Sequence, residues 1–345
     1  MQITRVGLDI AKRVFQLHAV DERGVVRTRK MLKRAQVKEY FAQLPPCLIG
    51  IEACAGSHYW GRELGKLGHT VKLMAAQFVT AYRKSGKNDA NDAEAICEAV
   101  GRPTMRFVSV KSEEQQSVLM LHRARTLMVA NRTAQVNQIR GLLGEFGIVV
   151  PQGITRLRSQ LSQILENAEN GIPDLARQVL ADLLEQLRYF DEQVEDYDKQ
   201  IAQLAEHSEP AKRLMAINGI GPLTATALVA TVGDARVFAN GRQFAAWLGL
   251  TQRQNSSGGK TRLGQITKRG DRYLRGLLVH GARATMRFLG RKEDPKSEWV
   301  KRLRARRHAN VVSVALAAKH ARIIWAMLAR GTGYDASLSA QVVAV

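Results

Sequence analysis

Alternating apolar and polar positions mark strands in the N-terminal part of the chain. Residues 3–12 alternate, and residues 14–20 do so again after a tight connection, which predicts two antiparallel strands. A third strand is expected over residues 26–31. Beyond it the pattern predicts, in turn, helices over 35–44, 60–67 and 91–100 and strands over 47–53, 71–74 and 107–110. The chain therefore begins with an α/β domain.

Helical periodicity dominates the middle of the chain. One long helix is predicted over residues 112–146, ended by Gly147 and Pro151. After it, two sets of apolar residues each recur every seven residues: Leu180, Leu187, Val194 and Ile201, and Leu183, Phe190, Tyr197 and Leu204. Four such heptads predict a coiled coil, which would make a dimer if it forms between chains. The alternative is an amphipathic helix packed within one chain.

Beyond Pro210 the sequence changes to Gly-rich turns and short helices. Residues 214–228 resemble a helix-hairpin-helix, in which Gly219 and Gly221 would expose backbone N–H groups to a phosphate. A purely structural hairpin is an equal alternative. Two C-terminal helices are expected, a basic one over 299–307 and an apolar one over 315–328. The pattern divides the chain into an α/β domain (1–150), a helical coiled-coil linker (151–209) and a mainly α, basic C-terminal domain (210–345).

Charge indicates the kind of partner. The formal net charge is +21, and residues 257–330 hold 19 Lys and Arg against 4 Asp and Glu. Residues 173–209 hold 3 basic and 10 acidic residues, so the basic surface belongs mainly to the C-terminal part. Such a field attracts polyanions, so nucleic acid or an anionic membrane is expected; a merely solubilising surface needs no such segregation. Because no run of about 18 apolar residues appears, we expect no membrane span and a cytoplasmic protein.

Four acids in the α/β domain predict a metal site. Asp9 ends the first predicted strand, and Glu52 closes the buried central strand. Asp89 and Asp92 lie three residues apart at a helix start, so both project from one face. Carboxylates brought together repel one another, and the cluster is therefore expected around hard cations such as Mg²⁺ or Mn²⁺, which could promote phosphodiester chemistry. Taken singly, each acid could instead cap a helix or form an ion pair.

A second group of reactive residues lies in the C-terminal part. Ser256 and Ser257 precede two glycines in a loop dense with cations, and Gln254 stands where a Walker A loop requires glycine. The loop could simply bind phosphate, or a serine could be a nucleophile on DNA that the carboxylate site activates. Seven basic residues are assigned to phosphate contacts, with solvated surface as the alternative: Arg253, Lys260, Arg262, Lys268, Arg269, Arg272 and Arg275.

With both groups in view, the chain resembles the DEDD-type transposases of insertion-sequence family one hundred and ten, and within it subgroup eleven hundred and eleven. The resemblance spans nearly the whole chain. It is carried by five motifs in order: Val6-Gly-Leu-Asp-Ile-Ala-Lys, Gly50-Ile-Glu-Ala, Lys87-Asn-Asp-Ala-Asn-Asp-Ala, Ile217-Asn-Gly-Ile-Gly-Pro, and Ser256-Ser-Gly-Gly-Lys with Ile266-Thr-Lys-Arg-Gly-Asp-Arg-Tyr-Leu-Arg.

The resemblance implies a ribonuclease H-like fold of the RuvC type. The predicted strands and helices follow one another in the order of that fold. It implies that Asp9, Glu52, Asp89 and Asp92 bind metal and that a catalytic serine maps to Ser257, although Ser256 stands beside it. It also implies a non-coding bridge RNA that selects donor and target DNA, and dimers that pair into a tetramer with shared sites. Two other functions remain open: a nuclease or transposase that uses metal-bound water, and a non-catalytic nucleic-acid scaffold.

Overall fold

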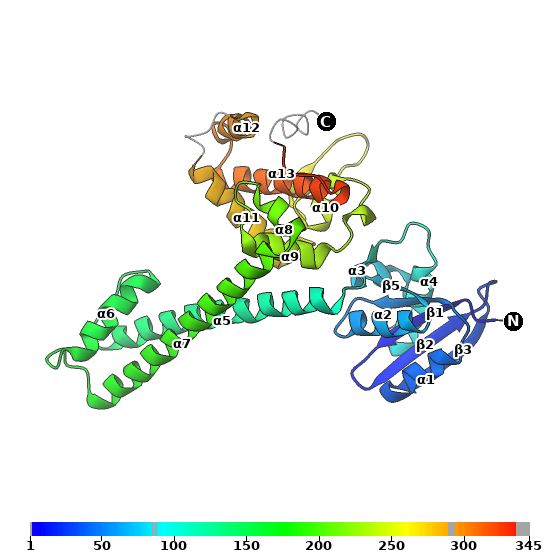
Figure 1. The fold of residues 1–345 in the computed structure, drawn as a ribbon, viewed down its shortest axis with the longest axis horizontal. Helices are drawn as coiled ribbons and strands as arrows, with labels where there is room; N and C mark the ends of the chain where they lie inside the picture. Colours follow the sequence, from blue (N-terminus) through cyan, green and yellow to red (C-terminus); the bar gives the residue numbers. More distant parts are fainter. Residues whose placement is uncertain (1, 85, 87, 289–293, 336–345) are drawn as a thin grey trace. The chain divides into compact units, whose positions relative to one another are not determined.

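The computed structural model describes residues 2–84, 86, 88–288 and 294–335, so Lys87 of the third motif lies outside the described residues. The chain divides into two compact units. One comprises Met1–Gln115 with Val232–Val237, and the other comprises Gln116–Thr231 with Phe238–Val345. The first is built on a sheet, and the second is almost entirely helical (Figure 1).

A six-stranded mixed sheet forms the first unit, in the order β3-β2-β1-β4-β5-β6. β1 pairs antiparallel with β2 and parallel with β4, so the two central parallel strands are β1 and β4, with β5 parallel beyond them. β3 and β6 are the antiparallel edges. The strands are β1 (Arg5–Ile10), β2 (Val14–Val20), β3 (Val26–Lys33), β4 (Leu48–Glu52), β5 (Thr70–Met74) and β6 (Phe107–Val108).

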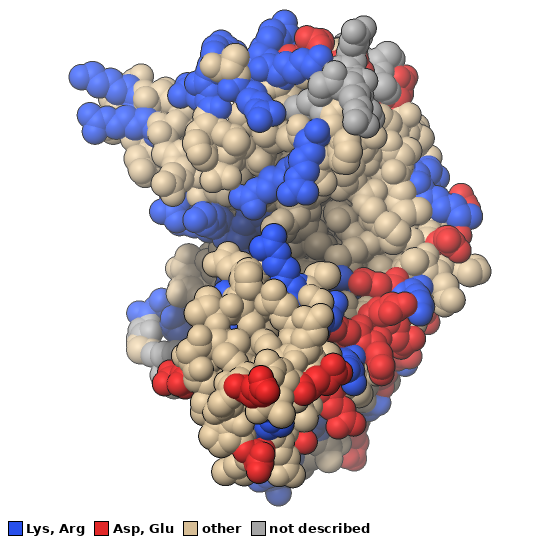
Figure 2. Space-filling model, turned by 90° about the vertical axis from the view of Figure 1, so that its left-hand side faces the viewer, with Lys and Arg blue, Asp and Glu red and all other residues tan. Residues whose placement is uncertain are grey.

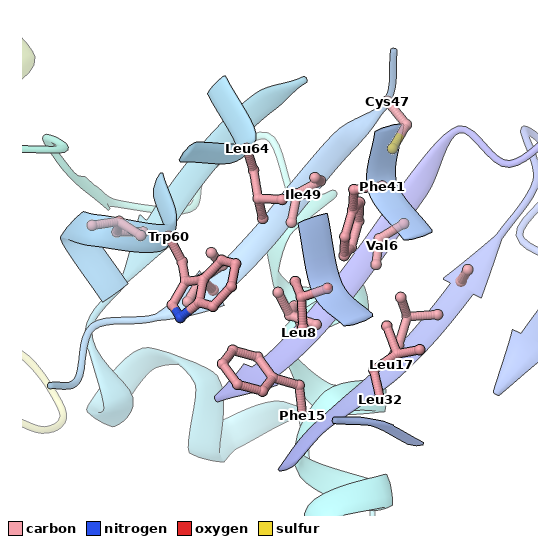
Figure 3. Packing of buried hydrophobic residues seen from close by; sticks show 14 residues of the cluster. Val6, Leu8, Phe15, Leu17, Leu32, Phe41, Cys47, Ile49, Trp60 and Leu64 are labelled. Atoms are coloured by element: carbon pink, nitrogen blue, oxygen red, sulfur yellow. The ribbon is translucent and has the colours of Figure 1, made fainter. Parts of the chain in front are cut away.

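Helices cover both faces of this sheet. Val6 and Leu8 of β1 point to one face, where they pack with Phe41, Trp60 and Leu64 in a fully apolar core (Figure 3). That face is covered by α1 (Val37–Ala42) and α2 (Ser57–Lys66). The other face carries α4 (Asp89–Val100), which follows the short α3 (Ala76–Val79). Alternate residues of each strand point to opposite faces. The residues that stand between the core-facing apolar positions therefore point to the α4 side.

A helical hairpin begins the second unit. It consists of α5 (Glu113–Glu145), whose first residues belong to the sheet unit, α6 (Ile154–Glu166) and α7 (Asp174–Glu206). Arg125 pairs with Asp198 at 2.6 Å and Arg132 pairs with Asp191 at 3.2 Å, so α5 and α7 run antiparallel side by side (Figure 1).

The first heptad seam of α7 is buried within this hairpin. Leu180 and Leu187 are at most 1% exposed and pack in one core with residues of α5 and α6, such as Ile139 and Leu157. At these two positions the structure therefore supports the amphipathic helix packed within one chain. The second seam remains partly exposed, and Leu204 is 38% exposed.

The rest of the second unit is a helical bundle with one small hairpin. Its helices are α8 (Glu209–Met215), α9 (Pro222–Val232), α10 (Gly241–Trp247), α11 (Arg272–Arg287), α12 (Pro295–Arg304) and α13 (Ala309–Arg330), and its strands are β7 (Gln252–Gln254) and β8 (Leu263–Ile266). By length and composition, α13 is the one helix of the described residues that could cross a membrane, but 56% of its apolar window is buried. It packs against α10 and α11, as the core helix of this unit.

His122 joins three helices of the second unit. Its Nδ1 lies 2.9 Å from the Tyr273 hydroxyl in α11, and its Nε2 lies 3.0 Å from Thr226 Oγ1 in α9. Thr226 donates its own proton to the carbonyl of Pro222, so the imidazole Nε2–H must donate to Thr226 and Nδ1 accepts from Tyr273. Burial and, after it, the charge of the neighbouring Arg125 together lower the pKa of His122 from 6.5 to about 4.

Acid should therefore weaken the helical unit through His122. A histidine whose folded pKa is depressed contributes stability that is complete above about pH 6.5 and is lost as the pH falls toward 4, here roughly 3 kcal/mol in all. We expect the melting temperature of the full chain to fall between pH 7 and pH 4.5, and the His122→Gln variant to lose less over the same interval. The variant should still lose some stability on acidification, because burial also lowers the pKa of His320, to about 3. An equal fall in the variant would show that His122 does not contribute.

The structure confirms the mixed α/β N-terminal part and the helical C-terminal part that the sequence predicts. It adds elements for which the sequence analysis gives no range, namely the helices α3, α6, α10 and α11 and the hairpin of β7 and β8. The strand residues of this hairpin are nearly all exposed. Because an exposed hairpin has no apolar face, its strands leave no alternating pattern to recognise.

Candidate active site

Asp9 and Glu52 lie at the carboxyl ends of neighbouring parallel strands. The register of β1 and β4 pairs Gly7 with Gly50 and Leu8 with Ile51, and each acid is the next residue along its strand. Because Leu8 and Ile51 point into the core beneath α1 and α2, the acids point to the opposite face, toward α4. Both are partly buried. The central strands thus place two carboxylates side by side.

Two glycines allow α4 to approach this face. A Cβ added at Gly7 would lie 2.1 Å from the carbonyl oxygen of Ala93 and 2.4 Å from the backbone nitrogen of Cys97. A Cβ at Gly50 would lie 2.7 Å from Cβ of Val100. Real side chains do not reach such distances, so α4 lies directly on the backbone of β1 and β4. Each glycine stands two residues before an acid, on the same face of its strand.

The first turn of α4 supplies the other two carboxylates. Asn88 caps the helix by accepting a hydrogen bond from the backbone N–H of Asn91 at 2.8 Å, and the helix begins at Asp89. Asp89 and Asp92 are both in the first turn, where the helix dipole favours negative charge. Neither acid is the residue that caps the helix, which removes one simpler explanation for their presence.

The four acids act on one another electrostatically. Burial and, after it, the charges of Asp89, Asp92 and Glu52 together raise the pKa of Asp9 from 3.8 to about 6. Arg83 opposes this field, because its Nη1 donates to Asp92 Oδ1 at 3.1 Å. Arg83 does not stand out in the sequence, where its position shortly before the acidic motif is its one signal.

The donor set fits a hard divalent cation, although the carboxylates are not drawn tightly together. Among the described residues, no group of three or more His, Cys, Asp or Glu side chains is arranged closely enough to hold a metal ion. The carboxylates repel one another, and Asp9 is destabilised as an anion. A bound Mg²⁺ or Mn²⁺ would relieve this repulsion. A bound cation would have to draw the four acids inward and compete with Arg83 for Asp92.

Ser257 lies at the tip of the hairpin in the second unit. Lys260 donates its backbone N–H to the carbonyl of Ser257 at 3.0 Å, and the two residues between them, Gly258 and Gly259, have φ of 55° and 76°. Two central residues with positive φ are typical of a type I′ turn, which only glycine and a few polar residues adopt readily. The sequence thus fixes Ser257 as the first residue of a tight, exposed turn.

The two neighbouring serines have different surroundings. Ser256 Oγ accepts from the backbone N–H of Arg262 at 3.2 Å and from Gln254 Nε2 at 3.0 Å, so it helps to close the hairpin. No hydrogen bond of the Ser257 hydroxyl is present among the described residues, and the side chain is exposed. The hydroxyl of Ser257 is therefore the one available for a reaction.

Six of the seven predicted phosphate-binding residues are exposed around this hairpin, and among the described residues none of the six forms an ion pair with an acid: Arg253, Lys260, Arg262, Lys268, Arg269 and Arg272. Lys268 is the one non-glycine residue with positive φ in the described part of the chain, at 56°. Arg275 is half-buried and donates to the carbonyls of Leu248 and Gly270, both at 3.2 Å. It thereby supports the base of the hairpin from within the fold.

The two glycines of the predicted helix-hairpin-helix also differ in their surroundings, one packed within the fold and the other exposed. Gly219 has φ of 90°, and a Cβ there would lie 2.3 Å from the carbonyl oxygen of Gly281 in α11. Gly219 therefore packs tightly within the unit. Gly221, just before α9, is exposed and has open space around it.

On the face drawn in Figure 2, Lys and Arg gather in the upper part, where the C-terminal helices lie in Figure 1.

Comparisons with known proteins define the class. A model of DEDD transposases matches residues 6–148, which contain all four acids, and a model described as transposase of the IS116/IS110/IS902 family matches residues 211–298, which contain Ser257. Both halves of the chain therefore match transposases, each over the segment that holds one group of candidate residues.

Whole-chain relatives agree with the family models. The chain is 51% identical to a probable family 20 transposase of Pseudomonas aeruginosa, over 97% of this chain and 99% of the relative. It is 44% identical to the transposase for insertion sequence element IS1111A of Coxiella burnetii, over 95% and 90%. It is 41% identical to the transposase for element IS1328 of Yersinia enterocolitica, over 96% and 99%. The chain belongs to the IS116/IS110/IS902 family of DEDD transposases. It is thus the transposase of an insertion sequence, with DNA as its partner, and the family implies use of a divalent metal ion.

Proposed function

We propose that this transposase cuts and exchanges DNA strands through a serine nucleophile, Ser257, that a Mg²⁺ or Mn²⁺ site on Asp9, Glu52, Asp89 and Asp92 activates. The observation that carries the proposal is that the carboxylates at the ends of β1 and β4 and in the first turn of α4 act on one another, with Asp9 destabilised as an anion. In this proposal residues 1–150 are the RuvC-like metal-binding domain and residues 210–345 the serine domain, joined by a helical linker over 151–209.

The chemistry follows from the two groups together. Bound divalent ions would lower the energy of the attacking and leaving oxygens at the phosphodiester. Asp9 and the other three acids hold the ions, and Ser257 brings its hydroxyl oxygen to the phosphorus atom. The Oγ–P bond forms as the P–O3′ bond breaks, the serine proton is lost, and the departing 3′ oxygen gains a proton. A 3′-hydroxyl of the new partner strand then attacks the 5′-phosphoserine and releases Ser257.

Three further features belong to the same proposal. The exposed cations around the hairpin and the exposed N-terminus of α9 at Gly221 would contact phosphates of DNA and of a non-coding bridge RNA, as in the subgroup eleven hundred and eleven that the chain resembles. The partly exposed second seam of α7, with Met120 and Leu127 exposed at 65% and 56% on α5, would pair subunits into dimers and then a tetramer. The protein would act in the cytoplasm, where the DNA is.

The serine is tested by a matched pair of variants. The full-length protein is incubated with Mg²⁺, a DNA fragment carrying its own gene with flanking sequence, and RNA transcribed from that flank. Wild type and Ser256→Ala should give a covalent protein–DNA adduct on a denaturing gel, reduced a few-fold in Ser256→Ala because that hydroxyl closes the hairpin. Ser257→Ala should give no adduct and no cut. Full cleavage by Ser257→Ala without an adduct would mean that metal-bound water attacks instead.

A further inference from the structure

The α4 side of the sheet extends past the carboxylates onto β2, which α4 contacts, and then onto the edge strand β3. Asp9 of β1 pairs with Gln16 of β2, and Gln16 pairs with Met31 of β3. Residues directly opposite in antiparallel strands share a face, so these three side chains form one row across the sheet. With strands about 4.8 Å apart, Met31 lies roughly 10 Å from Asp9. Arg29 and Lys33 flank Met31 on the same face.

Packing on both faces confirms these orientations. Leu32 of β3 is 2% exposed and lies in the core on the α1 and α2 side, and Lys30 lies over the ring of Tyr40 on that side. Arg29, by contrast, reaches Glu94 of α4 at 3.7 Å. The four residues Gln16, Arg29, Met31 and Lys33 are called the β3 shelf.

The shelf is open and cationic. Met31 is 68% exposed, the highest value for a large apolar residue on the strands of this sheet among the described residues, and the side chain of Arg29 is 61% exposed. Lys33 is exposed and forms no ion pair with a described acid. An exposed methionine between two cations offers a polarizable contact for a base and charge for phosphates on either side. A second β-strand is a poor occupant, because cationic side chains along an edge strand oppose pairing with another chain.

We propose that the β3 shelf holds the DNA strand that is cut, a nucleotide or two from the scissile phosphate. Arg29 and Lys33 bind backbone phosphates, Met31 contacts a base, and Gln16 bridges the shelf to Asp9. The shelf rests on the proposed function in one respect, since it takes the carboxylates as the place of cleavage. Its charge also offsets the repulsion between a polyanion and the four acids, because a strand held by cations two strands away can reach an acidic site.

A crosslinking experiment tests the position directly, without relying on activity. The photoreactive amino acid p-benzoylphenylalanine replaces Met31 in one full-length protein and Lys30 in another; Lys30 is exposed on the same strand but lies over the ring of Tyr40, on the opposite face. The probe is the labelled DNA fragment of the gene with its flank, with the flanking RNA present. Position 31 should crosslink to DNA close to the cut site, and position 30 should not. Crosslinking of position 31 to RNA alone, or to neither, would overturn the proposal.

Charge variants on the two faces give a second measurement. Lys33→Gln should weaken binding of the DNA fragment about fivefold and make the salt dependence of log K shallower by about 1, and Lys30→Gln, which removes the same charge from the other face, should change neither. Equal effects would reduce the shelf to general surface charge. The outcome separates from the proposed function: if Asp9→Asn still cuts DNA while position 31 crosslinks, the carboxylate site fails and the shelf stands. If Asp9→Asn is inactive and position 31 is silent, the reverse holds.

Discussion

Replacing Asp9 by asparagine should reduce DNA cutting by about a thousandfold or more and leave DNA binding nearly unchanged. The amide has the shape of the carboxylate but no charge, so the proposed site would lose a ligand for the divalent ions. A loss of about 4 kcal/mol in transition-state stabilisation corresponds to that factor. The affinity for DNA should persist, because the exposed cations proposed to bind phosphates are other residues of the chain.

The same variant should gain stability when no metal is present. Asp9 is partly buried beside three other carboxylates, and the substitution relieves their repulsion. With EDTA, Asp9→Asn should therefore melt at a higher temperature than wild type, whereas added Mg²⁺ should raise the melting temperature of wild type only. The control is Glu98→Gln at the far end of α4, which removes one acid and should keep activity and the Mg²⁺ response. An active Asp9→Asn enzyme would exclude the carboxylate site from the reaction.

Replacing Gly7 by alanine should disable the enzyme by displacing α4. The added methyl group would meet the backbone of Ala93 and Cys97 at 2.1 and 2.4 Å, and backbone atoms of a helix cannot move singly. The helix must shift by an ångström or more, and this shift moves Asp89 and Asp92 away from Asp9. We expect cleavage to fall about a hundredfold and the sheet unit to lose roughly 1 to 3 kcal/mol, as overpacked cores do.

Two other glycines grade this effect. Gly50→Ala meets a side chain, that of Val100 at 2.7 Å, which can turn aside, so its loss should be smaller than that of Gly7→Ala. Gly65, near the end of α2, has open space around it, and alanine there should be neutral or slightly stabilising. Melting temperature and the rate of DNA cutting are measured for all three. Wild-type values for Gly7→Ala would show that the close contact of α4 is not required.

The sequence predicts the sheet and the four acids because their signals are local. Asp9 and Glu52 end apolar strands, and Asp89 and Asp92 begin an amphipathic helix, so the pattern alone indicates where each carboxylate lies on its element. What brings the helix onto the strands is a contact between distant segments. The two glycines carry that information, but a glycine in a strand signals close approach only once its neighbour is known.

Other parts of the structure depend on contacts that periodicity does not specify. The heptads of α7 predict an apolar seam correctly, yet the partner of that seam is α5 and α6 of the same chain. The roles of the neighbouring serines also need the structure. The hydrogen bonds that Ser256 accepts from the backbone of Arg262 and the side chain of Gln254 show that it belongs to the hairpin. In the same way Arg275 reads as one cation among many until its two carbonyl partners are seen.

The contact of α4 with the sheet also constrains how this family can diverge. Gly7 faces main-chain atoms, which every sequence possesses, so no substitution elsewhere can compensate for a larger residue there, and lineages should keep it unchanged. Gly50 faces the side chain of Val100, so drift at one position can be matched by drift at the other. We expect positions 50 and 100 to covary among descendants of this element, small beside large, while position 7 stays fixed. Aligned sequences in which position 7 varies freely would contradict this history.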